Sequence, residues 1–306
     1  MANFSEVYNI NAPTMSNVEG DKTNVPLELS YILITIVNSI ACFPTFLLNV
    51  LVIMAVKKRP QLSTNSNTLL ACLAATDALT GLIGQPSIIL WKTFLLVGAS
   101  SSQTVEEFHY TYVSAVPISS LLHLILVTFE RLVVKFTMRY PNVITERKIK
   151  IAVIVIWFFS IICGVLRQSN FKLRFVFAFL LFFFYILFIA SAYVILYRET
   201  RRHQKMRRTQ QLTQDESERF AKENKALTTT VLVVGDAIVF YLPGCVYIVL
   251  ITFGSVKGSD SLVIAWIGTF AKFNSLINPL IYCWRQREMR KFVFGGRVQE
   301  VGSCNA

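Results

Sequence analysis

Residues 30–56 read SYILITIVNSIACFPTFLLNVLVIMAV and contain no charged side chain. A helix needs about 20 mostly apolar residues to cross the roughly 30 Å hydrocarbon core of a bilayer, so this stretch is long enough to span one. Six further stretches of this kind follow along the chain, at about 68–90, 108–135, 149–166, 173–198, 225–252 and 261–283. Because lipid offers no hydrogen-bond partner to the backbone, all seven are predicted to be helices.

The composition indicates a membrane protein. Of the 306 residues, 54% are hydrophobic and 16% are charged, whereas a soluble domain carries about 25% charged residues. A net charge of +12 would suggest a nucleic-acid partner for a soluble protein. Here the basic residues lie between apolar stretches, so we interpret them as membrane-flanking charge and expect membrane lipids, not nucleic acid, as partners. The six cysteines show no pattern of a disulfide framework.

The predicted organisation is an extracellular segment 1–29, a seven-helix transmembrane domain 30–283, and a cytoplasmic segment 284–306. Residues 285–294 combine basic and apolar side chains as a short amphipathic helix on the membrane surface does. Lys and Arg are concentrated in the first, third and fifth connections and in the tail, which places these on the cytoplasmic side and the N-terminus outside. Asn3 begins a glycosylation sequon in that outer segment.

Several predicted helices carry polar residues at membrane depth, where each one is costly and needs a reason. They come from the first, second, third and seventh helices: Asn49, Asp77, Ser120, Asn274, Ser275 and Asn278. One carboxylate among several neutral oxygen donors suits a monovalent cation or ordered water. Ordinary hydrogen bonding between helices explains the same residues equally well.

A second group of charges lies at the predicted cytoplasmic boundary. Glu130 and Arg131 end the third helix, and Glu223 stands at the start of the sixth, after a basic loop. An arginine at the boundary can extend its charged end into water without any further role. Residue type alone leaves that explanation open beside a functional one.

Six motifs in register resemble those of the rhodopsin-like (class A) G-protein-coupled receptors. They are Asn49 in LLNVLV, Asp77 in LAATDAL, the pair Glu130-Arg131, Trp157, Pro243, and NPLIY at 278–282. The resemblance covers about residues 30–295. It implies an all-α seven-transmembrane bundle in the plasma membrane that signals from an extracellular ligand to a cytoplasmic heterotrimeric G protein, with no enzymatic activity.

The resemblance also implies roles for individual residues. In the active state Arg131 would engage the G protein. In the resting state Arg131 would pair with Glu130 and Glu223 instead. The polar set at membrane depth corresponds to the family's allosteric sodium pocket, and no other cofactor is expected unless Lys272 binds retinal. The activation switch of the family corresponds to Tyr193, Tyr241, Pro243, Asn278, Pro279 and Tyr282.

The chain departs from the family pattern in its outer half. Glu106 stands where a disulfide cysteine is usual, and the fifth helix lacks its Pro, which is similar to the melanocortin, adenosine and cannabinoid receptors. Val113 stands in place of the amine-binding Asp, so monoamines are not expected as ligands. The residues predicted to line the ligand cavity, or else to be loop ends and packing residues, are Glu106, Glu107, Tyr110, Val113, Tyr241 and Lys272.

Lys272 leaves two functions open. It lies seven residues before Pro279, as the retinal-linking lysine of opsins does, and a Schiff base needs a desolvated lysine. A retinal-binding photoreceptor is therefore the alternative to a chemoreceptor, although His109 stands at the usual place of the opsin counterion. In a chemoreceptor the ammonium would need an acidic ligand or a carboxylate partner, and Glu106 and Glu107 are the nearest acids by level.

A transporter or channel is a remote alternative, suggested by Asp77, Asp236 and Lys272 near the membrane midplane. Two related halves and broken helices are typical of transporters, and the sequence shows neither. Asp236 is instead expected to face the bundle and to bond with Asn274 or Asn278, because buried charge persists only when it is partnered.

Overall fold

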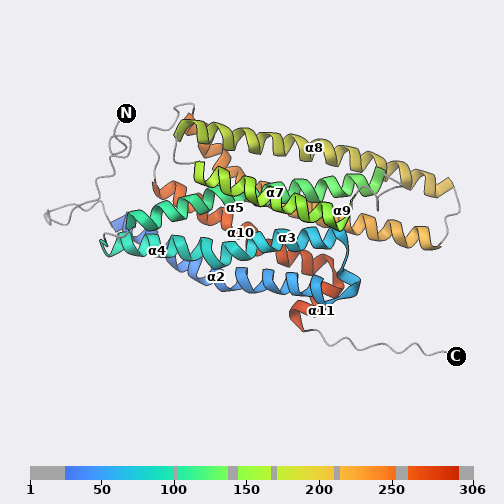
Figure 1. The fold of residues 1–306 in the computed structure, drawn as a ribbon, viewed down its shortest axis with the longest axis horizontal. Coiled ribbons are helices and arrows are strands. Elements are labelled where there is room, and N and C mark those ends of the chain that lie inside the picture. The colour runs from blue at the N-terminus through green and yellow to red at the C-terminus, as the bar shows by residue number, and fades with distance from the viewer. Residues whose placement is uncertain are drawn as a thin grey trace.

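The structure is a computed structural model that describes residues 25–99, 102–136, 144–166, 171–209, 214–252 and 261–295, and this part of the chain is almost entirely helical. The long helices lie side by side along one axis (Figure 1). They are α2 (Val25–Lys58), α3 (Asn65–Leu79), α4 (Gln85–Leu96), α5 (Ser102–Phe136), α7 (Glu146–Val165), α8 (Phe171–Thr209), α9 (Gln214–Thr252), α10 (Ser261–Arg285) and the short α11 (Arg287–Phe294). Two short turns, η1 (Pro60–Leu62) and η2 (Thr80–Gly84), complete the order.

Every predicted membrane helix has a counterpart, and the prediction of an all-α seven-helix bundle is confirmed. The second helix is the continuous run of α3, η2 and α4, in which η2 is a π-helical turn. Within the described residues, six of the helices are long and apolar enough to cross a membrane. The seventh, α10, has 25 residues, which is enough at about 1.5 Å per residue, but its inward face is polar.

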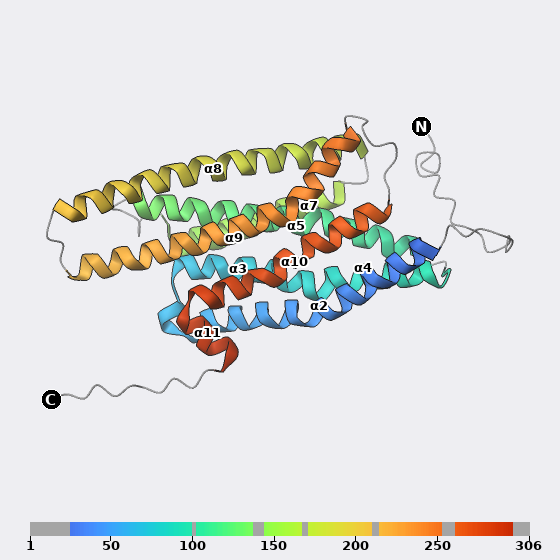
Figure 2. The ribbon, with the colours of Figure 1, turned by 180° about the vertical axis from the view of Figure 1, so that it is seen from behind.

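Two helices extend beyond the stretches predicted from hydropathy. The predicted spans 173–198 and 225–252 correspond to α8 and α9, which continue through residues 199–209 and 214–224. Both helices extend past α3 in either view (Figures 1 and 2). Hydropathy marks only the part of a helix that lies in lipid, so the polar continuation was missed.

Helix α11 lies across the end of the bundle, beside α2 (Figure 2). Its Met289 is fully buried against the core formed by the long helices. The helix ends at Gly295, whose φ of 64° is a left-handed conformation that glycine adopts without strain. The end of the bundle where α11 lies is called the α11 end below.

The π-helical turn brings the second helix against the first. A Cβ atom added to Gly81 would lie 2.5 Å from the backbone nitrogen of Phe46, so only glycine permits this approach. The thiol of Cys42 donates to the Gly81 carbonyl oxygen at 3.0 Å. Small residues that allow backbones to approach closely are typical of helix contacts within membranes.

Large apolar side chains cover the outside of the bundle. Phe43, Phe158 and Phe184 are each more than 60% exposed, and similar residues are found on the other long helices. In water such a surface would be an aggregation hazard, whereas in a bilayer it is the face that contacts lipid.

Candidate functional site

Asp77 is the centre of a buried polar cluster that joins three helices. Its two carboxylate oxygens accept hydrogen bonds from Ser275 Oγ at 2.7 Å and Asn278 Nδ2 at 2.8 Å. Asn49 Nδ2, on α2, donates to the backbone oxygen of Ser275 at 2.8 Å. All four residues are buried. Hydrogen bonding between helices, one of the two explanations that the sequence left open, therefore exists in the structure.

Within the part of the chain that the structure describes, the same cluster retains polar atoms without hydrogen-bond partners. They are Ser120 Oγ, both polar atoms of Asn274, and the side-chain oxygens of Asn49 and Asn278. Buried polar atoms are normally satisfied by protein groups, ordered water or an ion. One carboxylate with several uncommitted neutral oxygens is a donor set that fits a sodium ion, so the residues suit the ion that the resemblance implies.

Asp236 on α9 approaches this cluster but does not form the predicted bond. Asn278 Nδ2 already donates to Asp77, and neither polar atom of Asn274 has a partner. Asp236 Oδ2 is buried and makes no hydrogen bond. The expectation that Asp236 bonds with Asn274 or Asn278 is therefore wrong: the amide of Asn278 donates to Asp77 instead, and the amide of Asn274 bonds to neither carboxylate.

The residues of the predicted activation switch lie inside the bundle. Tyr282 is fully buried, and neither its hydroxyl nor that of Tyr193 has a hydrogen-bond partner, so the two do not bond to each other directly. Tyr241 on α9 is partly buried and packs against the core of the bundle. Pro243 and Pro279 lie within α9 and α10, where each removes a backbone hydrogen bond and creates a point at which the helix can bend.

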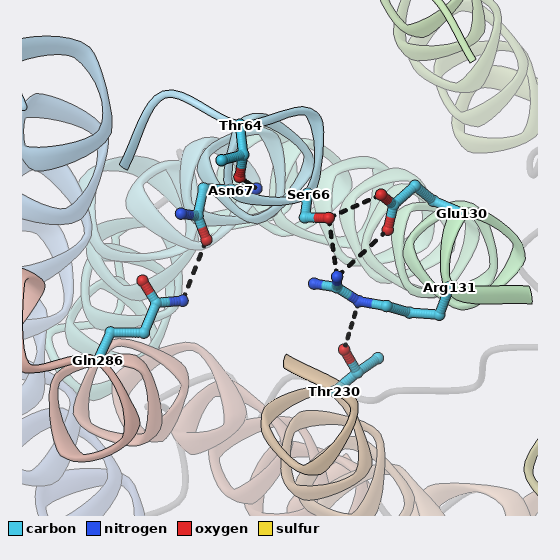
Figure 3. Close-up of polar contacts among 7 residues, drawn as sticks. All are labelled: Thr64, Ser66, Asn67, Glu130, Arg131, Thr230 and Gln286. Carbon is cyan, nitrogen blue, oxygen red and sulfur yellow. Dashed lines mark hydrogen bonds and ion pairs between the residues drawn. The ribbon is translucent and has the colours of Figure 1, made fainter. Parts of the chain in front are cut away.

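Arg131 joins three helices at the α11 end (Figure 3). Its Nη1 donates to Ser66 Oγ on α3 at 2.8 Å and lies 3.6 Å from Glu130 Oε2, while its Nε donates to Thr230 Oγ1 on α9 at 3.4 Å. The Ser66 hydroxyl in turn donates to Glu130 Oε1 at 2.7 Å. The side chain of Arg131 is 10% exposed, so the arginine does not extend into water as a boundary residue would.

The contact between Arg131 and α9 differs from the expected one. Thr230 is the α9 residue that accepts from Arg131, seven residues after Glu223, which is about two helical turns. Glu223 belongs to α9, but its side chain lies outside the described part of the structure. Ser66 and Thr230 were missed by sequence analysis because a single hydroxyl on a helix carries no signal of its own.

A further bond ties α11 to the same region. Gln286, the residue before α11, donates through Nε2 to Asn67 Oδ1 at 3.0 Å (Figure 3). Asn67 Nδ2 donates to the backbone oxygen of Leu62 at 3.0 Å. The start of α11 is thereby held near Ser66 and the Arg131 group.

At the end opposite α11, Lys92 lies two residues beyond the predicted second membrane helix, 68–90. In the structure it belongs to helix α4. Lys92 is fully buried in α4, and its ammonium lies 3.7 Å from the Trp91 ring centroid and 4.2 Å from that of Tyr31. Glu106 interacts with it electrostatically. Tyr110 packs on Trp91 with ring centroids 5.1 Å apart. The buried ammonium is thus matched by two aromatic faces and an acid.

Lys272 is buried in α10, and its Nζ donates to the backbone oxygen of Gly268 at 3.2 Å. Neither of the acids proposed as its partner forms an ion pair with it: Glu106 acts on Lys92, and Glu107 is exposed. His109, at the place of the opsin counterion, shares a hydrogen bond of 2.7 Å with Ser87.

The remaining predicted site residues are placed as follows. Val113 and Tyr241 are partly buried on α5 and α9. Asn3 lies outside the described residues, as does most of the predicted outer connection at 167–172.

Comparison with known proteins agrees with this geometry. The family model described as "7 transmembrane receptor (rhodopsin family)" matches residues 48–174 and 166–282. Melanocortin receptor 5 of Mus musculus is 23% identical over 253 residues, covering 79% of this chain and 77% of that receptor. Melanocortin receptor 3 of Rattus norvegicus is 26% identical over 257 residues, covering 79% and 78%. The histamine H2 receptor of Cavia porcellus is 24% identical over 272 residues, covering 79% and 73%.

Proposed function

Because the chain belongs to the rhodopsin family of seven-transmembrane receptors, we propose that it signals from an extracellular ligand to a cytoplasmic heterotrimeric G protein. It is a multi-pass plasma-membrane receptor, as its relatives are. The α11 end faces the cytoplasm in this proposal. Lys57 and Lys58 end α2 there, and Arg285 ends α10, which agrees with the preference of basic residues for the cytoplasmic side.

The Arg131 group is the observation that carries the proposal. Its guanidinium is held by Glu130 and Ser66 and, among the side chains of α9 that the structure describes, contacts Thr230. A movement of α9 away from α5 would break the Thr230 contact and uncover the guanidinium for a cytoplasmic partner. A ligand that binds better to the open arrangement would shift the population toward it.

The Asp77 cluster provides a second point of control. Asp77, Ser120 and Asn274 would hold a sodium ion, whose charge offsets the buried carboxylate. These residues come from α3, α5 and α10, so an ion among them would favour the packed, resting arrangement of those helices.

Arg131→Ala tests the proposal. We expect the variant to reach the cell surface as the wild type does and to lose G-protein activation measured by dissociation of labelled G-protein subunits. Lys150→Ala is the control, since Lys150 is exposed and pairs only with Glu146 on its own helix. Arg131→Ala signalling at the wild-type level, at equal surface density, would remove the main support for the proposal.

A further inference from the structure

Lys272 is a buried basic residue, and no group in the described structure balances the charge of its ammonium form. It is 7% exposed, and within the described residues its only polar partner is the backbone oxygen of Gly268, one turn earlier in α10. A carbonyl dipole satisfies one N–H group and leaves the positive charge without an anion. Within the described residues, no carboxylate acts electrostatically on this ammonium.

The other buried cations of the bundle show what a balanced site looks like here. Arg131 lies 3.6 Å from Glu130; the ammonium of Lys92 makes no hydrogen bond within the described residues, but it lies against the rings of Trp91 and Tyr31 and within electrostatic reach of Glu106. A buried charge without a partner is strongly destabilising, so proteins seldom keep one that has no use. In a membrane helix such a residue marks a functional site.

The face of α10 that carries Lys272 is identified by its contacts. Thr269 Oγ1 accepts a hydrogen bond from Asn38 Nδ2 on α2 at 3.1 Å, and Ala265 packs with Trp91 of α4. This face therefore lies against α2 and α4. Asn38 Oδ1 and Trp91 Nε1 are buried there without partners.

The surroundings of this face are mainly apolar. Ile34 and Ile88 pack with Trp91 and Ala265, and all four are buried. From Ala265 to Lys272 the helix rises by about 10 Å. An anionic group at Lys272 would thus adjoin an apolar region with a few uncommitted polar atoms.

We propose that Lys272 binds the carboxylate of an amphiphilic ligand, whose apolar part replaces some of the apolar contacts around this face of α10. The inference rests on the receptor function proposed above and names the chemical class of its ligand. Such a carboxylate could belong to a fatty acid arriving from the membrane or to the C-terminus of a peptide. Both supply the anion that the described part of the structure does not place at Lys272.

The first test needs no ligand and uses the full-length protein in nanodiscs. Because Lys272→Met removes an unbalanced buried charge, its thermal unfolding midpoint should rise by about 2–4 °C. Lys272→Arg should show no such rise. Lys92→Met is the matched control and should lower the midpoint, since it leaves Glu106 without its cation. A midpoint that falls in Lys272→Met would show a structural lysine and overturn the proposal.

The second test distinguishes the two sources of the carboxylate. Dodecanoate and N-acetylphenylalanine are compared with their primary amides for their effect on the unfolding midpoint. We expect one acid to raise the midpoint of the wild type and of Lys272→Arg, but not of Lys272→Met, while its amide has no effect. Failure of both acids, or a rise that persists in Lys272→Met, would overturn the proposal.

Incubation of the protein with retinal tests the photoreceptor alternative. A visible absorption band in the wild type with retinal, lost in Lys272→Met, would assign the lysine to an imine and overturn the carboxylate site. These measurements involve no G protein, so their failure is separate from any failure of Arg131→Ala to lose signalling.

Discussion

Arg131 and Lys272 are both basic residues inside the bundle, but they differ in the groups that surround them. Arg131 is held by a carboxylate and by hydroxyl groups from α3 and α9. Within the described residues, Lys272 bonds only to its own helix. Arg131 has a carboxylate beside it and contacts two other helices, so it can hold those helices together. Lys272 lacks an anion among the described residues, which is the condition expected of a binding residue before its ligand arrives.

The largest expected effect comes from breaking the balance at Arg131. Glu130→Ala leaves the guanidinium buried without its carboxylate, and removing one partner of a buried pair costs about 3–5 kcal/mol. We expect a clear fall in the thermal unfolding midpoint of the purified receptor. Glu146→Ala is the matched control, because Glu146 forms an exposed pair with Lys150 and should leave the midpoint unchanged. Equal midpoints for the two variants would mean that Arg131 is no better balanced than Lys272.

An intermediate effect is expected at the central carboxylate. In the wild type, raising the sodium concentration at constant ionic strength should lower basal G-protein signalling. Asp77→Asn keeps a polar side chain beside Ser275 and Asn278 but removes the negative charge, so the response to sodium should disappear. The measurement is basal signalling in membranes with sodium replaced by N-methylglucamine. If Asp77→Asn still responds to sodium, the Asp77 cluster does not bind the ion and only joins the helices by hydrogen bonds.

The smallest effect is expected where Arg131 touches α9. Thr230→Val removes the hydroxyl that accepts from the guanidinium, and a net hydrogen bond contributes about 0.5–1.5 kcal/mol, which corresponds to a roughly 2–10-fold rise in basal signalling. Thr229→Val is the control, because the Thr229 hydroxyl donates to Lys225 within α9 and not to α5. Basal signalling that rises equally in both variants would point to general loosening of α9.

Sequence analysis identified the important charged residues of this protein but not their polar partners. The importance of Arg131 and Asp77 follows from their position in apolar stretches and from the motifs around them. Their partners Ser66, Thr230 and Ser275 lie 65, 99 and 198 residues away. Which hydroxyl meets which charge depends on how the helices are rotated and shifted against one another, and hydropathy contains no such information.

The sequence by itself determined that seven helices cross a membrane, because the cost of placing charge and unbonded backbone in lipid is a local property of each stretch. It also singled out Lys272 as unusual. Only the tertiary structure decided that Lys92 is buried against the rings of Trp91 and Tyr31 and that Lys272 has no acid beside it among the described residues. It likewise decided that Asp236 makes no bond with Asn278. These outcomes depend on competition among several charges for few partners, which is settled only when all the helices have packed.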